Sequence, residues 1–255
     1  MRNAGFVGTR WLGVGLAAAL AVVTISLAVT GRLGLYINPD SAWFAVSMAV
    51  LVLVGTVASF ALPLGAEADH GHDHGDVNAE EPSHAHPRHP AAVGAGVVGG
   101  VAASGVVVLA LVLPPASLSA ELAMSRDVGA TPLFGGADTI QLASTGDTAS
   151  FGVGEWSTAF ATATNPDAFD GDPVELTGFV TPAEDGGFDL TRLVITHCVI
   201  DAQPASVPVL AAAAVPDTGQ WVTITGTVRS SSDGRLAIDA ASVQSIPEPE
   251  DPYEY

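Results

Sequence analysis

Three long apolar runs, none containing a charged residue, dominate the first half of the chain: residues 11–30, 43–64 and 91–113. Each run is long enough to cross a hydrocarbon core of about 30 Å as an α-helix, which rises about 1.5 Å per residue. A helix also satisfies its own backbone hydrogen bonds, as a segment surrounded by lipid must. The runs therefore predict three transmembrane helices, the first two forming a hairpin within residues 1–64.

The arginines around the first run predict its orientation. Arg2 and Arg10 precede it, and the positive-inside rule places that end of the chain in the cytoplasm. Three crossings then place residues 65–90 in the cytoplasm and everything after residue 113 outside the cell membrane. A cleaved signal peptide is the alternative for the first run, but the run is longer than usual and lacks a clear small-x-small cleavage site.

The predicted cytoplasmic loop, residues 65–90, is rich in histidine and carboxylate side chains. Imidazole and carboxylate together suit zinc, nickel, copper or cobalt. Such a tract cannot build a packed core, so we expect weak, exchangeable metal binding, with a plain solvated linker as the alternative. The candidate ligands in this loop are His70, His72, His74, His84, His86 and His89.

The overall charge limits the partners and the chemistry. The chain is 48% hydrophobic yet carries a net charge of −19, which indicates an apolar part joined to an acidic part. So acidic a chain argues against nucleic acid as a partner, because phosphate binding requires clustered positive charge. A single cysteine excludes an intrachain disulfide, so the soluble part must be stabilised by its own core.

The second half has the pattern of a small β domain. Residues 114–149 are predicted to be a linker, and Trp156 and Phe160 lie four apart on a short amphipathic helix. Alternating apolar and polar residues separated by turn signals then predict five short strands in about 75 residues, as in an OB-type barrel. The predicted fold class is membrane α plus β: three N-terminal transmembrane helices followed by a small extracytoplasmic OB-like β-barrel domain at residues 150–255.

The stretch HCVIDAQP, residues 197–204, contains the only cysteine and the only histidine outside the loop. Neighbours on a straight strand point to opposite faces, so His197 and Cys198 can share one metal ion only if the strand ends or bulges there. Asp201 and Pro204 indicate such an end. His197, Cys198 and Asp201 would then form a zinc ligand set that lacks one member.

Two other interpretations of this stretch stay open. In the structural one, the cysteine belongs to the core and the histidine lies at a strand end. In the catalytic one, Cys198 is a nucleophile, which requires a histidine within hydrogen-bond reach and usually a third orienting group. Adjacent strand residues seldom meet that requirement, so we expect no enzymatic activity.

Several segments are shared, in order, with one family. They are GRLGLYINP, VELTGFV, RLVITHCVIDAQPASVPV, WVTITGTV and the terminal PYEY. The chain thereby resembles the YcgQ-like family of bacterial membrane proteins, which are described as permease subunits. Members commonly have two adjacent cysteines where this chain has His197 and Cys198, and histidine can replace thiolate as a metal ligand. The match of the acidic, proline-rich tail suggests that Tyr253 or Tyr255 packs on the barrel.

The resemblance implies a separate multi-helix permease as partner, in addition to membrane lipid. Three helices without a charged residue offer no ion path of their own. We therefore expect an accessory subunit of a two-component permease for a transition metal, zinc first, or a metal-containing solute, which the external domain captures or gates. The alternatives are a membrane-anchored metal-binding or sensing protein without transport, or a structural domain that stabilises a partner.

Overall fold

The computed structural model describes residues 4–61, 98, 101–109, 113, 116–118, 120–126, 148–183, 187–210 and 215–255. The chain divides into two compact units. The helical unit comprises Met1–Leu33 and Ala42–Pro115, and the β unit comprises Gly34–Ser41 and Ala116–Tyr255. The short segment between the first two helices therefore belongs to the β unit, although the sequence places it far from the strands.

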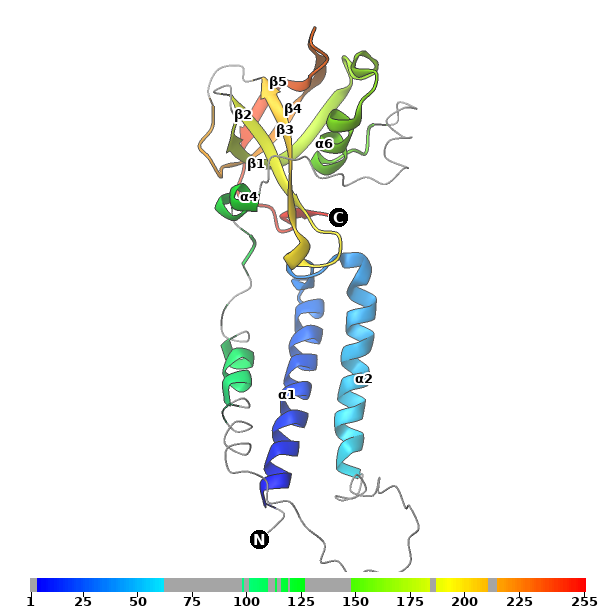
Figure 1. The fold of residues 1–255 in the computed structure, drawn as a ribbon, viewed down its shortest axis with the longest axis vertical. Coiled ribbons are helices and arrows are strands. Elements are labelled where there is room, and N and C mark those ends of the chain that lie inside the picture. The colour runs from blue at the N-terminus through cyan, green and yellow to red at the C-terminus, as the bar shows by residue number, and fades with distance from the viewer. Residues whose placement is uncertain are drawn as a thin grey trace, which may run out of the picture. The chain divides into compact units, whose positions relative to one another are not determined.

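Two helices, α1 (Ala4–Val29) and α2 (Ala42–Ala61), lie side by side in the helical unit (Figure 1). Among the described residues, one helix, Pro39–Ser59, is long and apolar enough to cross a membrane, and the apolar helix Gly13–Val29 is shorter. One candidate span thus stands in the described residues where the sequence predicts three. The third predicted helix is described as helical at 101–109 and lies otherwise mostly outside the described residues, as does the histidine-rich loop.

The end of α1 has a physical cause in Gly31. Its φ of 73° is a left-handed conformation that glycine adopts without steric cost. The amide of Arg32 then donates to the carbonyl of Leu27 at 2.9 Å, which satisfies a carbonyl at the helix terminus. The chain leaves the helix here and enters the β unit at Gly34.

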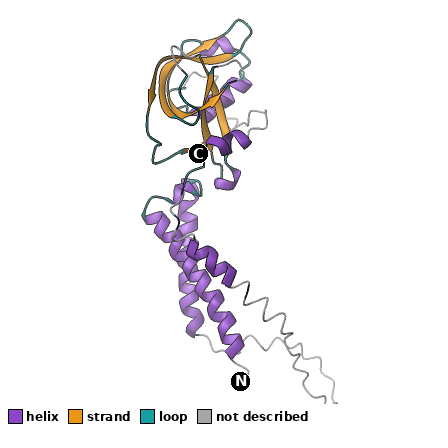
Figure 2. Cartoon of the chain, turned by 90° about the vertical axis from the view of Figure 1, so that its left-hand side faces the viewer, coloured by secondary structure: helices purple, strands orange, loops and turns teal. Residues whose placement is uncertain are grey.

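The strands of the β unit form a closed five-stranded barrel with one short added strand (Figure 2). The strand order is β1-β4-β5-β3-β2-β6, and an additional β1–β2 pairing closes the ring. All pairs are antiparallel except β3–β5 and β2–β6. The barrel confirms the prediction of a closed β domain and is consistent with the OB type. The strands are β1 (Pro173–Pro182), β2 (Phe188–Val194), β3 (Gln203–Leu210), β4 (Trp221–Ser230), β5 (Leu236–Ser245) and β6 (Tyr253–Glu254).

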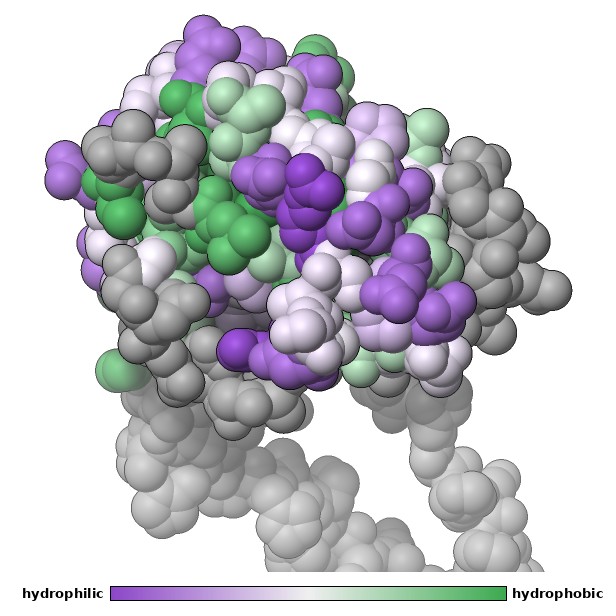
Figure 3. Space-filling view, turned by 90° about the horizontal axis from the view of Figure 1, so that it is seen from above, coloured by the Kyte–Doolittle hydropathy of each residue, from purple (hydrophilic) through white to green (hydrophobic). Residues whose placement is uncertain are grey.

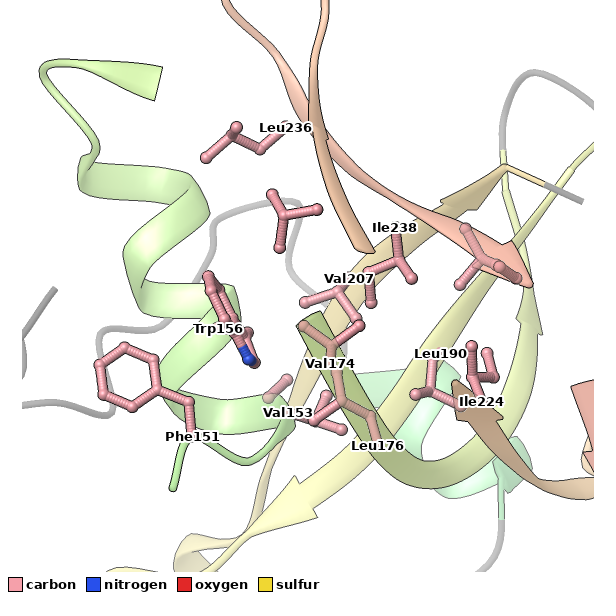
Figure 4. Close-up of a cluster of buried hydrophobic side chains, with 14 of the residues drawn as sticks. Phe151, Val153, Trp156, Val174, Leu176, Leu190, Val207, Ile224, Leu236 and Ile238 are labelled. Carbon is pink, nitrogen blue, oxygen red and sulfur yellow. The ribbon is translucent and has the colours of Figure 1, made fainter. Parts of the chain in front are cut away.

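The core of the barrel is closed by helix α6 (Val153–Thr162), which carries the predicted aromatic pair. Trp156 points toward the strand side chains and makes edge-to-face contacts with Phe151, Phe160 and Phe169 (Figure 4). Leu190, Val207, Ile224 and Ile238 from four strands are fully buried in the same cluster. The period of four in the sequence therefore located a helix whose apolar face covers the barrel.

A second, smaller core lies apart from this cluster and joins distant parts of the chain. Its buried members from the barrel region are Phe179, Leu193, Ile195, Ala202 and Tyr253. Against them pack Ala123 of helix α4 (Ala120–Arg126), Leu118, and Leu35 from the segment between the first two helices. The predicted linker at residues 114–149 thus contains a helix that contributes to the fold.

Candidate functional site

The stretch HCVIDAQP forms the connection between two strands. β2 ends at Val194, and a short 3₁₀ turn, η4, covers Val199–Asp201 before β3 begins at Gln203. The predicted strand end before Cys198 is therefore present. We call residues 196–201 the motif loop.

Asp201 organises the motif loop. Its carboxylate accepts hydrogen bonds from the backbone amides of Thr196 at 3.2 Å, His197 at 3.0 Å and Cys198 at 3.2 Å. It also lies 3.2 Å from Nδ1 of His197. Burial acts to raise the pKa of Asp201, but these hydrogen bonds outweigh it and hold the pKa below its usual value. The residue therefore serves as an ionised cap for three consecutive amides.

His197 and Cys198 lie in different environments. The His197 side chain is 81% exposed and contacts Asp201. Cys198 is a half-buried free thiol whose backbone forms an isolated bridge with Ile37. The loop thus brings His197 and Asp201 together through their side chains, while Cys198 joins Asp201 through its main-chain amide.

The segment between the first two helices forms one wall of the site. The amide of Asn38 donates to the carbonyl of His197 at 3.0 Å, and the amide of Val199 donates to the carbonyl of Tyr36 at 2.9 Å. The Asn38 side chain adds a bond to the Thr196 carbonyl at 3.1 Å. Two segments that the sequence singled out separately, GRLGLYINP and HCVIDAQP, are therefore neighbours.

The motif loop falls short of a complete metal site. Among the residues that the structure describes, no group of three or more His, Cys, Asp or Glu side chains is placed to hold a metal ion. His197 and Asp201 offer two donors, and both carboxylate oxygens already accept backbone amides. The site in this chain therefore does not fit a resident metal without ligands from elsewhere. The six loop histidines lie outside the described residues.

Three residues around the loop were given no role from the sequence, although Ile200 and Tyr36 lie in segments that the sequence singled out. Ile200 is 83% exposed at the tip of η4, although it is a large apolar side chain. Arg126 of α4 donates to the carbonyl of Ala202 at 2.8 Å and so closes the turn from outside. Tyr36 supplies the carbonyl that receives Val199. Only a knowledge of which segments meet could have identified these three.

The C-terminal tail forms hydrogen bonds with three distant parts of the β unit. Tyr253 is buried and its hydroxyl accepts the Leu118 amide at 2.8 Å, while the Tyr255 hydroxyl donates to the Gly34 carbonyl at 3.2 Å. Between them, Glu254 accepts the amides of Val153 at 2.9 Å and Gly154 at 2.7 Å, at the N-terminus of α6. Tyr253 therefore packs within the fold, as the tail's match suggested, whereas Tyr255 is an exposed residue that bonds to Gly34.

Glu254 is a buried carboxylate beside a cation. Burial raises its pKa, and the two α6 amides and Arg192, 3.9 Å away, offset part of that rise. Arg192 in turn donates to the carbonyls of Asp251 at 2.7 Å and Tyr253 at 3.2 Å. The face of the molecule seen in Figure 3 mixes hydrophilic and hydrophobic side chains.

Comparison with known proteins identifies the barrel alone. Neither the curated proteins nor the solved structures gave a match. One family model does match part of the chain. Its region includes part of α6, the whole barrel, the motif loop and the tail, and excludes the helical unit and residues 34–41. Residues 157–255 of this chain match the DUF1980 C-terminal domain family.

Proposed function

We propose that this chain is an accessory subunit of a two-component membrane permease, anchored by its apolar helices, whose extracytoplasmic β unit captures or gates a solute. One observation carries the proposal. Residues Gly34–Ser41 connect the first two apolar helices, yet they belong to the β unit and bond to the motif loop. The segment that connects the two apolar helices thus also bonds to the motif loop, which supports a gating role for that loop.

The same observation supports a third crossing. Residues 34–41 and 116–255 belong to one compact unit, so they lie on the same side of any membrane that the helices span. If α2 crosses that membrane, the chain must cross back before residue 116. The apolar run at 91–113 is long enough to do so. With Arg2 and Arg10 inside, the proposed topology has a cytoplasmic N-terminus and an outer β unit.

The proposed solute is a transition metal, zinc first, or a metal-containing compound. The histidine-rich loop offers ligands on the inner side, and His197 with Asp201 offers two donors on the outer side. Two donors suit transient capture of a cargo that keeps other ligands, whereas resident zinc usually has four. We accordingly propose a binding role and not a catalytic one.

The partner is tested by affinity purification of the tagged full chain from its own membranes in mild detergent. A multi-helix permease in stoichiometric amount is the expected result. Its absence after covalent crosslinking would remove the accessory-subunit proposal and favour the metal-binding or sensing alternative.

The solute is tested by calorimetry with zinc on the full chain lacking residues 65–90. Removing that loop leaves the outer donors as the ones under test. Weak binding that disappears in the His197→Ala variant, and persists in a matched His197→Asp variant, is expected. Equal binding in all three proteins would show that the motif loop takes no part.

A further inference from the structure

We propose that the tip of the motif loop, led by Ile200, rests in the interfacial region of the lipid bilayer. The inference rests on the proposed membrane anchoring and adds a second point of contact between the β unit and lipid. Ile200 is the starting observation. Its side chain is 83% exposed, compared with 50% for Leu210 and 49% for Val215 elsewhere in the β unit.

The exposure of Ile200 does not come from a loose loop. Asp201, the next residue, accepts three consecutive backbone amides. Arg126 donates to the carbonyls of Val199 at 3.4 Å and Ala202 at 2.8 Å, on either side of the tip. The turn is thus fixed by its polar groups, and it holds one large apolar side chain outward.

The position of the motif loop along the chain indicates that its tip contacts lipid. His197 accepts the Asn38 amide, and only Pro39–Ser41 separate Asn38 from the first residue of α2. Four residues span roughly 14 Å even when fully extended. When the helix spans the bilayer, the chain length therefore keeps the residue that bonds to the loop within about that distance of the headgroup level.

The residues just before and just after this connection along the chain have the composition of a membrane interface. Tyr36 bonds to Val199 through its carbonyl and is 38% exposed. Trp43 and Phe44 at the start of α2 are 71% and 56% exposed. Tyrosine and tryptophan are enriched at headgroup level, where an apolar ring and a polar atom are both accommodated. Ile200 supplies the purely apolar contact that such a site buries.

The test uses the single cysteine. Cys198→Ser removes it, and Ile200→Cys in that background places an environment-sensitive NBD label at the tip. The labelled full chain is reconstituted in phosphatidylcholine vesicles that contain a lipid with a shallow nitroxide quencher. Trp43→Cys reports on the helix anchor. Ser232→Cys lies in the exposed turn between β4 and β5 and serves as the aqueous control.

Quenching at position 200 within about twofold of that at position 43, and at least several-fold above that at position 232, is expected. Quenching at 200 no greater than at 232, while 43 is quenched, would overturn the inference and leave the anchoring proposal standing. Absence of quenching at 43 as well would overturn both. Ile200 is exposed, so its replacement does not threaten the fold, and near-UV circular dichroism of each variant verifies this.

Discussion

Replacing Tyr253 by alanine should remove a large part of the stability of the β unit. The side chain is 2% exposed, lies in the second core, and accepts the Leu118 amide at 2.8 Å. Truncating a buried aromatic ring to alanine costs about 3–5 kcal/mol. Whole domains are stable by about 5–15 kcal/mol, so the loss is a substantial fraction of the total.

A phenylalanine variant separates packing from hydrogen bonding. Tyr253→Phe keeps the ring but leaves the Leu118 amide without its partner, which should cost about 1–3 kcal/mol. Tyr255→Phe is the matched control. That residue is 41% exposed, so its hydroxyl bonds to Gly34 and Asp251 face competition from water and their loss should cost under about 1 kcal/mol.

Urea unfolding of the full chain in detergent, followed by tryptophan fluorescence, measures these differences. Trp221 reports on the second core directly, because it packs against that cluster and against Phe179. The midpoint should fall in the order wild type, Tyr253→Phe, Tyr253→Ala, with an unchanged slope. An alanine variant within about 1 kcal/mol of wild type would refute the assignment of the tail as a structural element.

Three further predictions concern single residues. Asp201→Asn should speed amide hydrogen exchange at residues 196–198 severalfold, and since the Asp201 pKa is lowered, wild type should lose this protection only as pH falls below about 4. Glu254 has a raised pKa, so its ionised form disfavours folding, and the stability of the β unit should fall as pH rises above about 4.5. The unfolding midpoint of Glu254→Gln, measured beside wild type across pH, should lack this pH dependence. Gly178→Ala should destabilise the barrel by about 1–3 kcal/mol in thermal melts, because its Cβ would lie 2.6 Å from the Thr191 carbonyl; an unchanged melting temperature would contradict this.

The barrel was predictable because its signals are local. Alternation in segments such as residues 221–228 reflects one face in the core and one outside, and the turns between strands carry glycine, aspartate and serine. The spacing of Trp156 and Phe160 located α6 for the same reason, since residues four apart share one helix face. Patterns of this kind need no knowledge of the rest of the chain.

The site was less predictable because its contacts are long-range. Asp201 suits a metal ligand and a cap for backbone amides equally well, and only the geometry assigns the second role. No sequence pattern in LYINP predicts that Asn38 bonds to residues 196 and 197. No pattern near Arg126 predicts its bond to Ala202 either. The two-residue strand β6 is too short to carry a periodic signal.

The bond between Tyr255 and Gly34 joins residues 221 positions apart, which bears on how the protein is made. At the usual translation rate of about 5–20 residues per second, Gly34 emerges roughly 10–45 s before its partner. During that time Leu35 and its neighbours have no second core to join. The tail therefore completes the second core only after all five barrel strands have been synthesised, and residues 34–41 lack these contacts throughout that interval.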